Sequence, residues 1–139
     1  MPRDKLFITG ATGAVGHYLV EVFGNDPNYE LFLLVRDKTR FRFDLSCYNN
    51  IKILSGDMEN IGHHKDILSE MTLVIHAATN WCGHQEVNDQ AVSDLFDCLN
   101  RVKIKKMIFF STASILGQGN VLLDSAMTFG TDYVRSKYK

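Results

Sequence analysis

Proline, cysteine and long apolar stretches are scarce in this chain, which has two Pro and three Cys among its 139 residues. Cys47, Cys82 and Cys98 are odd in number and lack the spacing of a metal site. They argue against a disulfide framework and predict reduced thiols in a cytoplasmic protein. The longest apolar runs, such as Leu31 to Val35 and Met107 to Phe110, are far too short to span a bilayer. We therefore expect neither a secreted protein nor a membrane partner.

An excess of one charge is also missing, because the formal net charge is -1 at pH 7. This balance excludes the broad basic surface of a nucleic-acid-binding protein and a long acidic tail. The five His residues show no ligand spacing, so we expect no metal site. With 45% hydrophobic and 22% charged residues, the composition is that of a soluble globular protein, and the length suits one domain with a real core.

What the sequence does contain is a regular alternation of strand-length apolar runs with helix-length amphipathic segments. The expected strands are Lys5 to Thr9, Glu30 to Val35, Ile51 to Leu54, Thr72 to His76 and Lys106 to Phe110. The expected helices are Ala14 to Gly24, Thr39 to Tyr48, Asn60 to Met71 and Gln85 to Val102. The strands are almost continuously apolar, as expected for parallel strands covered on both faces. The pattern predicts an α/β fold with a doubly wound parallel sheet of about five strands.

The segment "FITGATGAVG" places Gly10, Gly13 and Gly16 between the first expected strand and the first expected helix. The first glycine permits a sharp turn, the second lets a pyrophosphate approach the backbone, and the third lets the helix pack closely on the strand. The helix N-terminus then offers N–H groups and the positive end of its dipole to the phosphates. In this βαβ context the glycines predict dinucleotide binding.

The end of the second strand bears on the choice between NAD and NADP. Arg36 stands at that end in "LFLLVRDKTR", followed by Lys38 and Arg40. A guanidinium suits the 2′-phosphate of NADP, so we favour NADP. If the strand ends one residue later, Asp37 reaches the ribose instead and favours NAD. A solvated loop of mixed charge is the third interpretation.

The glycine turn and several later segments together resemble one family. "TGATGAVG" is similar to the turn of extended short-chain dehydrogenases/reductases, the epimerase, dehydratase and dihydroflavonol-reductase group. "SGD", with Asp57, resembles the family's adenine-contacting segment, "HAAT" its small-residue turn, and "VNDQAV", with Asn88, its helix asparagine. The cofactor site that the resemblance implies comprises Gly10, Thr12, Gly13, Ala14, Val15, Gly16, Arg36, Lys38, Asp57, Met58, Ala77, Ala78, Thr79, Asn88, Ser111 and Lys137.

The catalytic residues that the resemblance implies are Thr112, Tyr133 and Lys137. Thr112 lies in "FFSTASILG", which resembles the segment of the catalytic Ser or Thr, and "YVRSKY" resembles the YxxxK signature. Tyr133 and Lys137 are four residues apart, so they share one helix face, and a nearby ammonium lowers the pKa of a phenol. The family mechanism gives Tyr133 the proton exchange with a substrate oxygen that Thr112 also binds, and Lys137 the nicotinamide ribose. By itself, a Tyr-x-x-x-Lys pattern in a helix is usually surface decoration.

The resemblance implies that residues 1–139 are a dinucleotide-binding Rossmann domain, truncated at the C-terminus and lacking the substrate lobe of the family. It predicts an NADP-dependent oxidoreductase acting on a small-molecule carbonyl or alcohol. An NAD-dependent sugar-nucleotide epimerase or dehydratase and a non-catalytic NADP-binding module remain as alternatives. The apolar strand that ends in Phe110 also predicts an exposed sheet edge, and hence self-association of the chain or a homo-oligomer.

Overall fold

Strands and helices alternate throughout the computed structural model, which describes residues 2–79, 85–100 and 102–110. The strands are β1 (Asp4–Thr9), β2 (Tyr29–Val35), β3 (Ile51–Ser55), β4 (Leu73–His76) and β5 (Lys106–Phe109). The α-helices are α1 (Ala14–Gly24), α2 (Lys65–Leu68) and α3 (Gln85–Leu99). Three short 3-10 helices complete the described part: η1 (Lys38–Arg40), η2 (Leu45–Cys47) and η3 (Met58–His64).

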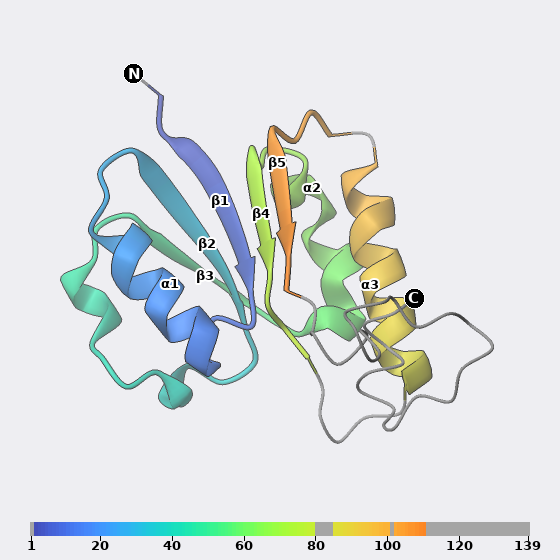
Figure 1. Cartoon of the computed structure of the whole chain (residues 1–139), viewed down its shortest axis with the longest axis horizontal. Helices are drawn as coiled ribbons and strands as arrows, with labels where there is room; N and C mark the ends of the chain where they lie inside the picture. Colours follow the sequence, from blue (N-terminus) through green and yellow to red (C-terminus); the bar gives the residue numbers. More distant parts are fainter. Residues whose placement is uncertain (1, 80–84, 101, 111–139) are drawn as a thin grey trace, which may run out of the picture.

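The strands form one parallel sheet in the order β3-β2-β1-β4-β5 (Figure 1). The chain runs from β1 outward to β3 on one side, then returns to place β4 on the other side of β1. This reversal makes the carboxyl ends of β1 and β4 the topological switch point, which is where ligands bind in open α/β sheets. The α/β fold with a doubly wound parallel sheet, predicted from the alternation of segments, is confirmed.

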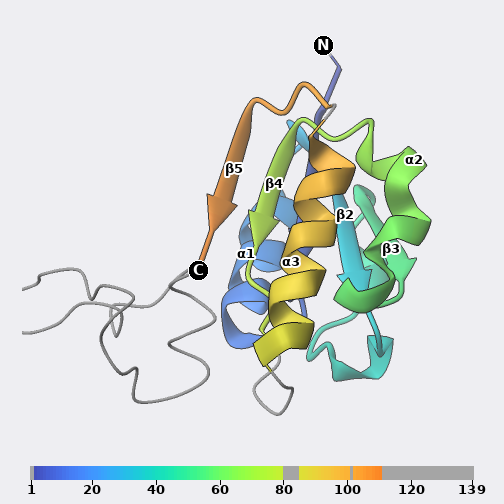
Figure 2. The same cartoon turned by 90° about the vertical axis from the view of Figure 1, so that its right-hand side faces the viewer.

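Helices cover both faces of the sheet, α1 on one side and α2 with α3 on the other (Figures 1 and 2). Two cores result, because successive residues of a strand point to opposite faces. On the α1 face, Val20 packs with Ile8 and Leu33 in a fully buried cluster. On the opposite face, Leu95 of α3 packs with Phe7 and other buried side chains.

The segment between β2 and β3 differs from its prediction, since it contains no α-helix where Thr39 to Tyr48 was expected to form one. It contains instead the short helices η1 and η2, each begun by an aspartate. Asp37 accepts from the N–H of Thr39, and Asp44 accepts from the N–H of Ser46. Each carboxylate therefore supports a single local turn, and Phe41 and Asp44, between the turns, have extended backbone angles.

The helix predicted over Asn60 to Met71 is also longer than the observed one, because most of this range is not α-helical. The 3-10 helix η3 occupies its first part, and only the four residues of α2 are α-helical. Asn60 has non-helical backbone angles, and its N–H donates to the carboxylate of Asp57. The polar cap thus begins a tight turn that the apolar pattern alone did not reveal.

Asn50 joins the start of β3 to the elements beside it. Its buried side-chain nitrogen donates to the carbonyl oxygens of Phe23, Asp26 and Tyr29, at 3.2, 3.2 and 3.0 Å. The carbonyl of Asn50 also accepts from the N–H of Leu31 at 2.7 Å. One side chain therefore ties the end of α1, the following turn and the start of β2 to the strand that comes next.

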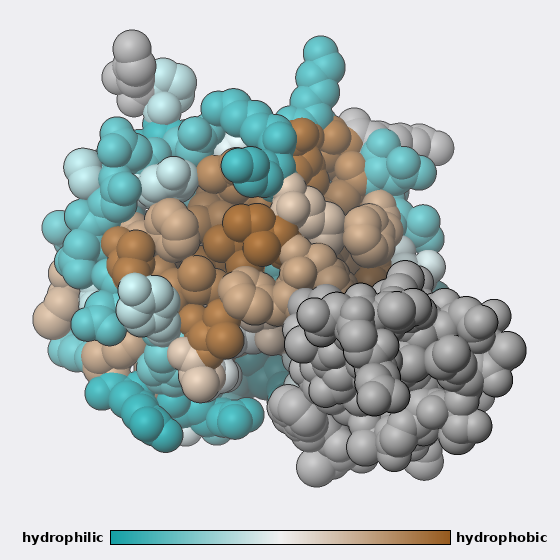
Figure 3. Space-filling view, in the orientation of Figure 1, coloured by the Kyte–Doolittle hydropathy of each residue, from teal (hydrophilic) through white to brown (hydrophobic). Residues whose placement is uncertain are grey.

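Strand β5 lies at the outer edge of the sheet within the described part of the chain. Ile108 is paired in register with Ile75, and Ile75 with Ile8, so all three lie on the α1 face. Helix α1 covers the other half of that face, and Ile108 is 45% exposed. Apolar surface extends across this face (Figure 3).

Candidate functional site

The turn after β1 and the turn after β4 are in direct backbone contact. Gly10 has a φ angle of +75°, a conformation that L side chains rarely adopt. A Cβ atom at this position would lie 2.6 Å from the nitrogen of Ala78 and 2.7 Å from the carbonyl carbon of Ala77. Only glycine fits, and the structure thus brings together three of the residues predicted to bind a cofactor.

A buried polar pair at the ends of β1 and β4 supports this contact between the two turns. The Thr9 hydroxyl lies 2.8 Å from Nδ1 of His76, and both residues are buried at the ends of adjacent strands. The N–H of Ala78 donates to the same hydroxyl at 3.3 Å, and the N–H of Ala77 donates to the Thr9 carbonyl at 3.2 Å. The imidazole of His76 also stacks on Phe109 of the neighbouring strand. These contacts fix the turn after β4 relative to the end of β1.

The N-terminus of α1 has the properties of an anion-binding helix end. Gly13 is the residue before the first helical turn; no side chain caps the helix there, and its first turn contains no acidic residue. Gly16 brings the helix close to the turn, since a Cβ atom would lie only 2.1 Å from the Gly10 carbonyl oxygen. Thr12, Ala14 and Val15 lie in the same stretch, and Val15 is exposed. The backbone N–H groups and the positive helix dipole here suit a phosphate group.

The end of β2 carries the predicted cations. The strand ends at Val35, so Arg36 is the first residue beyond it, and both Arg36 and Lys38 are exposed. Asp37 accepts hydrogen bonds from the N–H and the hydroxyl of Thr39, at 2.9 and 2.6 Å. The Thr39 hydroxyl, followed by the Thr39 N–H, holds the pKa of the Asp37 carboxyl below its ordinary value. This carboxylate is therefore ionised and bonded within its own loop.

The end of β3 lies beside the end of β2. The N–H of Gly56 donates to the carbonyl of Val35 at 3.1 Å, which sets the two strand ends together. Asp57 follows and accepts from the N–H and the side-chain nitrogen of Asn60, at 3.2 and 3.0 Å. Met58 is half-buried and packs against the core on the α3 face. Asp57 and Met58 thus follow the carboxyl end of β3, and their contact with adenine stays a prediction.

Some predicted site residues fall partly or wholly outside the described part. Asn88 lies on α3, with its side chain outside the described set, and the Thr79 hydroxyl donates to the Ala78 carbonyl at 2.9 Å. The remaining predicted residues all lie outside the described residues: Ser111, Thr112, Tyr133 and Lys137. The structure therefore describes most of the predicted cofactor-binding residues and none of the predicted catalytic residues.

Two groups in the site were not predicted. One is the Thr9–His76 pair, and the other is His17, which contacts both the glycine turn and the loop after β2. Polar residues at the ends of neighbouring buried strands were a usable signal for the first. No sequence signal pointed to His17, because both of its hydrogen-bond partners are backbone atoms.

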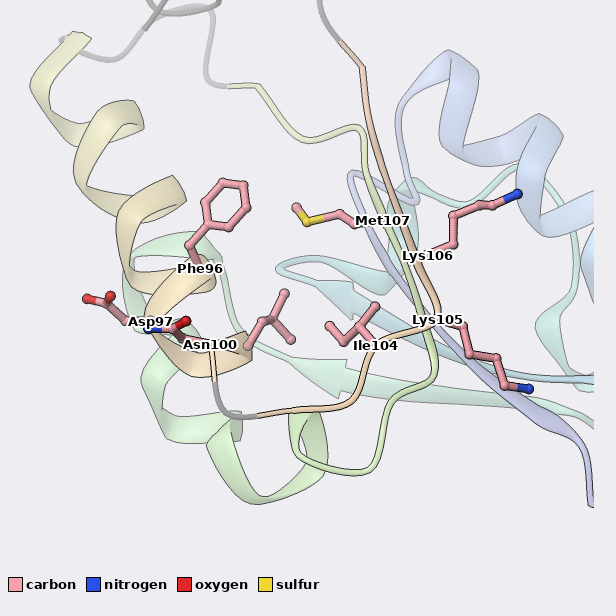
Figure 4. Close-up of a pocket in the computed structure, with 8 residues that line it drawn as sticks. Phe96, Asp97, Asn100, Ile104, Lys105, Lys106 and Met107 are labelled. Carbon is pink, nitrogen blue, oxygen red and sulfur yellow. The ribbon is translucent and has the colours of Figure 1, made fainter.

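A depression of about 480 Å³ lies between α3 and the start of β5, away from the turns at the carboxyl ends (Figure 4). Phe96 and Met107 point toward one another across it, whereas Lys105 and Lys106 point away. Its lining mixes apolar side chains with charged and amide side chains, and it brings none of the predicted site residues together. Among the residues that the structure describes, no cluster of His, Cys, Asp or Glu suits a metal ion, and no helix is long and apolar enough to cross a membrane.

Comparisons with known proteins bear on this site. The sequence profile of the NAD dependent epimerase/dehydratase family matches residues 6–139. No curated protein sequence matches the chain. Similar solved structures include the oxidoreductase ylbE from Lactococcus lactis, with 22% identity, a TM-score of 0.72, and coverage of 96% of this chain and 59% of that one.

Two further structures were solved with a cofactor. WbmG from Bordetella bronchiseptica, in complex with NAD and UDP, has 19% identity and a TM-score of 0.77, over 99% of this chain and 47% of that one. UDP-glucuronic acid 4-epimerase from Bacillus cereus, in complex with NAD, has 17% identity and a TM-score of 0.76, over 96% and 48%. At these identities the likeness shows the fold, and the chain spans about half the length of the last two proteins.

Proposed function

The chain belongs to the NAD dependent epimerase/dehydratase family, and from that premise we propose that it is the cofactor-binding part of an NADP-dependent oxidoreductase of the extended short-chain type. The substrate is a small-molecule carbonyl or alcohol. The pyrophosphate would lie at the N-terminus of α1, where no side chain caps the helix. The two described cysteines, Cys47 and Cys98, are free, which is consistent with the reducing cytoplasm that we propose for it.

The observation that carries the choice of NADP is the pair of groups at the end of β2. Arg36 is exposed directly after the strand, whereas one oxygen of the Asp37 carboxylate, Oδ1, accepts both the N–H and the hydroxyl of Thr39 within the loop. A guanidinium forms charge-assisted, often bidentate bonds with a phosphate. A ribose 2′-hydroxyl requires an acidic acceptor instead, and here one oxygen of the acidic residue already accepts two hydrogen bonds inside the loop.

The test is to titrate the chain with NADPH and NADH, and to repeat both titrations with Arg36→Ala. We expect NADPH to bind more tightly, and the substitution to weaken NADPH binding about ten- to one-hundredfold while leaving NADH nearly unchanged. Arg3→Ala is the matched control, since Arg3 is exposed near the N-terminus. Tighter binding of NADH, or an equal effect of Arg36→Ala on both cofactors, would refute the choice of NADP.

The second candidate is an NAD-dependent sugar-nucleotide epimerase or dehydratase. It is favoured by the structural likeness to WbmG and to the Bacillus cereus epimerase, both solved with NAD. Cofactor that stays bound through purification and proves to be NAD would favour this candidate over the first.

The proposed reaction uses residues of the C-terminal segment. The nicotinamide, when bound, supplies or accepts the hydride. Tyr133 would exchange a proton with the substrate oxygen, Thr112 would donate a hydrogen bond to that oxygen, and Lys137 would lower the pKa of the phenol. A panel of carbonyl substrates tests this role: we expect Tyr133→Phe to abolish turnover while NADPH affinity stays the same. Tight NADPH binding with no turnover by the unsubstituted chain would indicate a non-catalytic binding module instead.

A further inference from the structure

His17 connects two parts of the site that are distant in sequence. It lies in the first turns of α1, where its Nδ1 is 2.9 Å from the Gly13 carbonyl oxygen. Its Nε2 is 3.2 Å from the backbone nitrogen of Arg42 and accepts that N–H. Because Nε2 accepts, the ring proton is on Nδ1, which donates to Gly13. The neutral imidazole is thus a bridge with one donor and one acceptor, and both are used.

Two aromatic residues of the loop after β2 also contact the imidazole ring of His17. The Phe41 ring meets it edge-on with centroids 5.5 Å apart, and the Phe43 ring does so at 5.4 Å. Phe43 in turn contacts Tyr48 at 5.7 Å, which extends the cluster toward β3. His17 therefore attaches the chain that leaves β2 to α1 by one backbone hydrogen bond and two ring contacts, and Phe41 and Phe43 also pack against the buried core on the α1 face.

The loop that His17 anchors begins with the proposed 2′-phosphate contacts. Residues 36–43 leave β2 at Arg36, pass through Lys38, and reach the anchor at Phe41 to Phe43. Asp37 and Thr39 bond to each other inside this loop, so they shape it without attaching it to α1. Its position relative to the glycine turn depends on the contacts at its far end.

We propose that His17 is a positioning residue, which sets the distance between the loop cations and the glycine turn and so contributes to the preference for NADP over NAD. This inference rests on the proposed function. Both cofactors carry the pyrophosphate that the glycine turn binds, but only NADP carries the phosphate that the loop contacts. A looser loop therefore weakens NADP binding selectively, because part of the binding free energy would be spent on ordering the loop.

Two substitutions separate the halves of the bridge. In His17→Asn, the side-chain amide nitrogen stands close to the place of Nδ1 and keeps the donor to Gly13, but nothing accepts from Arg42. In His17→Gln, the longer side chain places its oxygen near the position of Nε2 and keeps the acceptor. Both variants lose the ring, so the comparison isolates the hydrogen bond from the aromatic packing. Far-UV circular dichroism and a thermal melt verify that both fold.

The affinities for NADPH and NADH are then measured for each protein. We expect His17→Asn to weaken NADPH binding about three- to tenfold more than NADH binding, and His17→Gln to retain most of the original ratio. A second measurement needs no cofactor: hydrogen exchange at the Arg42 amide. We expect this amide to be protected in the original chain and in His17→Gln, and to exchange faster in His17→Asn.

The outcomes distinguish the two proposals. Unchanged exchange at Arg42 in His17→Asn overturns the bridge. Faster exchange with equal losses for NADPH and NADH overturns the specificity role and leaves His17 merely structural. A third outcome separates the two proposals. If the Arg42 amide exchanges faster only in His17→Asn, but the original chain shows no preference for NADPH, the bridge is supported and the proposed choice of cofactor fails.

Discussion

Replacing Gly16 by alanine tests whether the close packing of α1 on the glycine turn is as tight as the structure indicates. A Cβ atom there would lie 2.1 Å from the Gly10 carbonyl oxygen and 2.5 Å from the Ala11 Cα atom. Both are backbone atoms, so no side-chain rotation relieves the overlap and the helix itself must shift. Overpacking of this kind costs about 1–3 kcal/mol or more, and alanine's helix preference returns about 1 kcal/mol. We expect a net loss of about 2 kcal/mol, because the overlap calls for the upper end of that range.

The matched control is Gly62→Ala, because a Cβ atom at Gly62 meets nothing within 4 Å. That substitution stiffens the unfolded chain, so we expect it to be neutral or to stabilise by up to about 1 kcal/mol. Urea unfolding followed by circular dichroism measures both free energies, and titration with NADPH measures cofactor binding. Equal stability and equal NADPH affinity of the two variants would refute the inferred packing and the phosphate site that depends on it.

Three further predictions concern stability and association. Asn50→Ala should lower the free energy of unfolding by about 2–3 kcal/mol, because it removes the buried amide that donates to three backbone carbonyls; the exposed Asn25→Ala should change it by less than about 0.5 kcal/mol in the same urea titration. The pKa of Asp37 is lowered in the folded protein, so its contribution is present above its ordinary pKa and is lost as the pH falls through the lowered value. Asp37→Ala should therefore be less stable than the original chain at neutral pH, and the difference should vanish on acidification; a constant difference would contradict this. We also propose that the β5 edge pairs with a second copy of the chain, so light scattering should show a concentration-dependent mass that Ile108→Lys reduces to that of a monomer.

The sheet was predictable because its strands are short, continuous apolar runs that can be recognised in the sequence itself. Five apolar runs of strand length gave the strands within two residues, and α1 was predicted with its observed bounds. In α3, Ala91, Leu95 and Leu99 are buried on one stripe, as their spacing predicted. The prediction of a helix over residues 39–48 was wrong for a physical reason. Its aromatic residues are spaced by two and five, and they pack on the side of His17 rather than along a helix face.

The candidate site was predictable where glycine or charge was required, and less so where backbone atoms are the partners. Gly10 and Gly16 are positions that no other residue fits, so the motif reflects the geometry directly. Arg36 was identified by its place at a strand end, which the structure confirms. The role of His17 depends on a contact with the backbone of Arg42, twenty-five residues away along the chain, and any residue type there supplies the same N–H.

The two halves of the cofactor site are held by different kinds of interaction, and this difference bears on how each can change. The glycine turn is fixed by backbone contacts between Gly10 and Ala78 and by hydrogen bonds from the Thr9 region, so its geometry is inseparable from the pairing of β1 with β4. The loop after β2 is attached mainly by side chains, namely by His17 and by Phe41 and Phe43, which pack against it and against the core. Substitutions in the first half therefore disturb the fold together with the site, whereas one or two substitutions in the second half alter only the adenosine end. On the proposed function, the ability to bind a dinucleotide is as robust as the sheet, and the choice between NAD and NADP is open to change at little cost in stability.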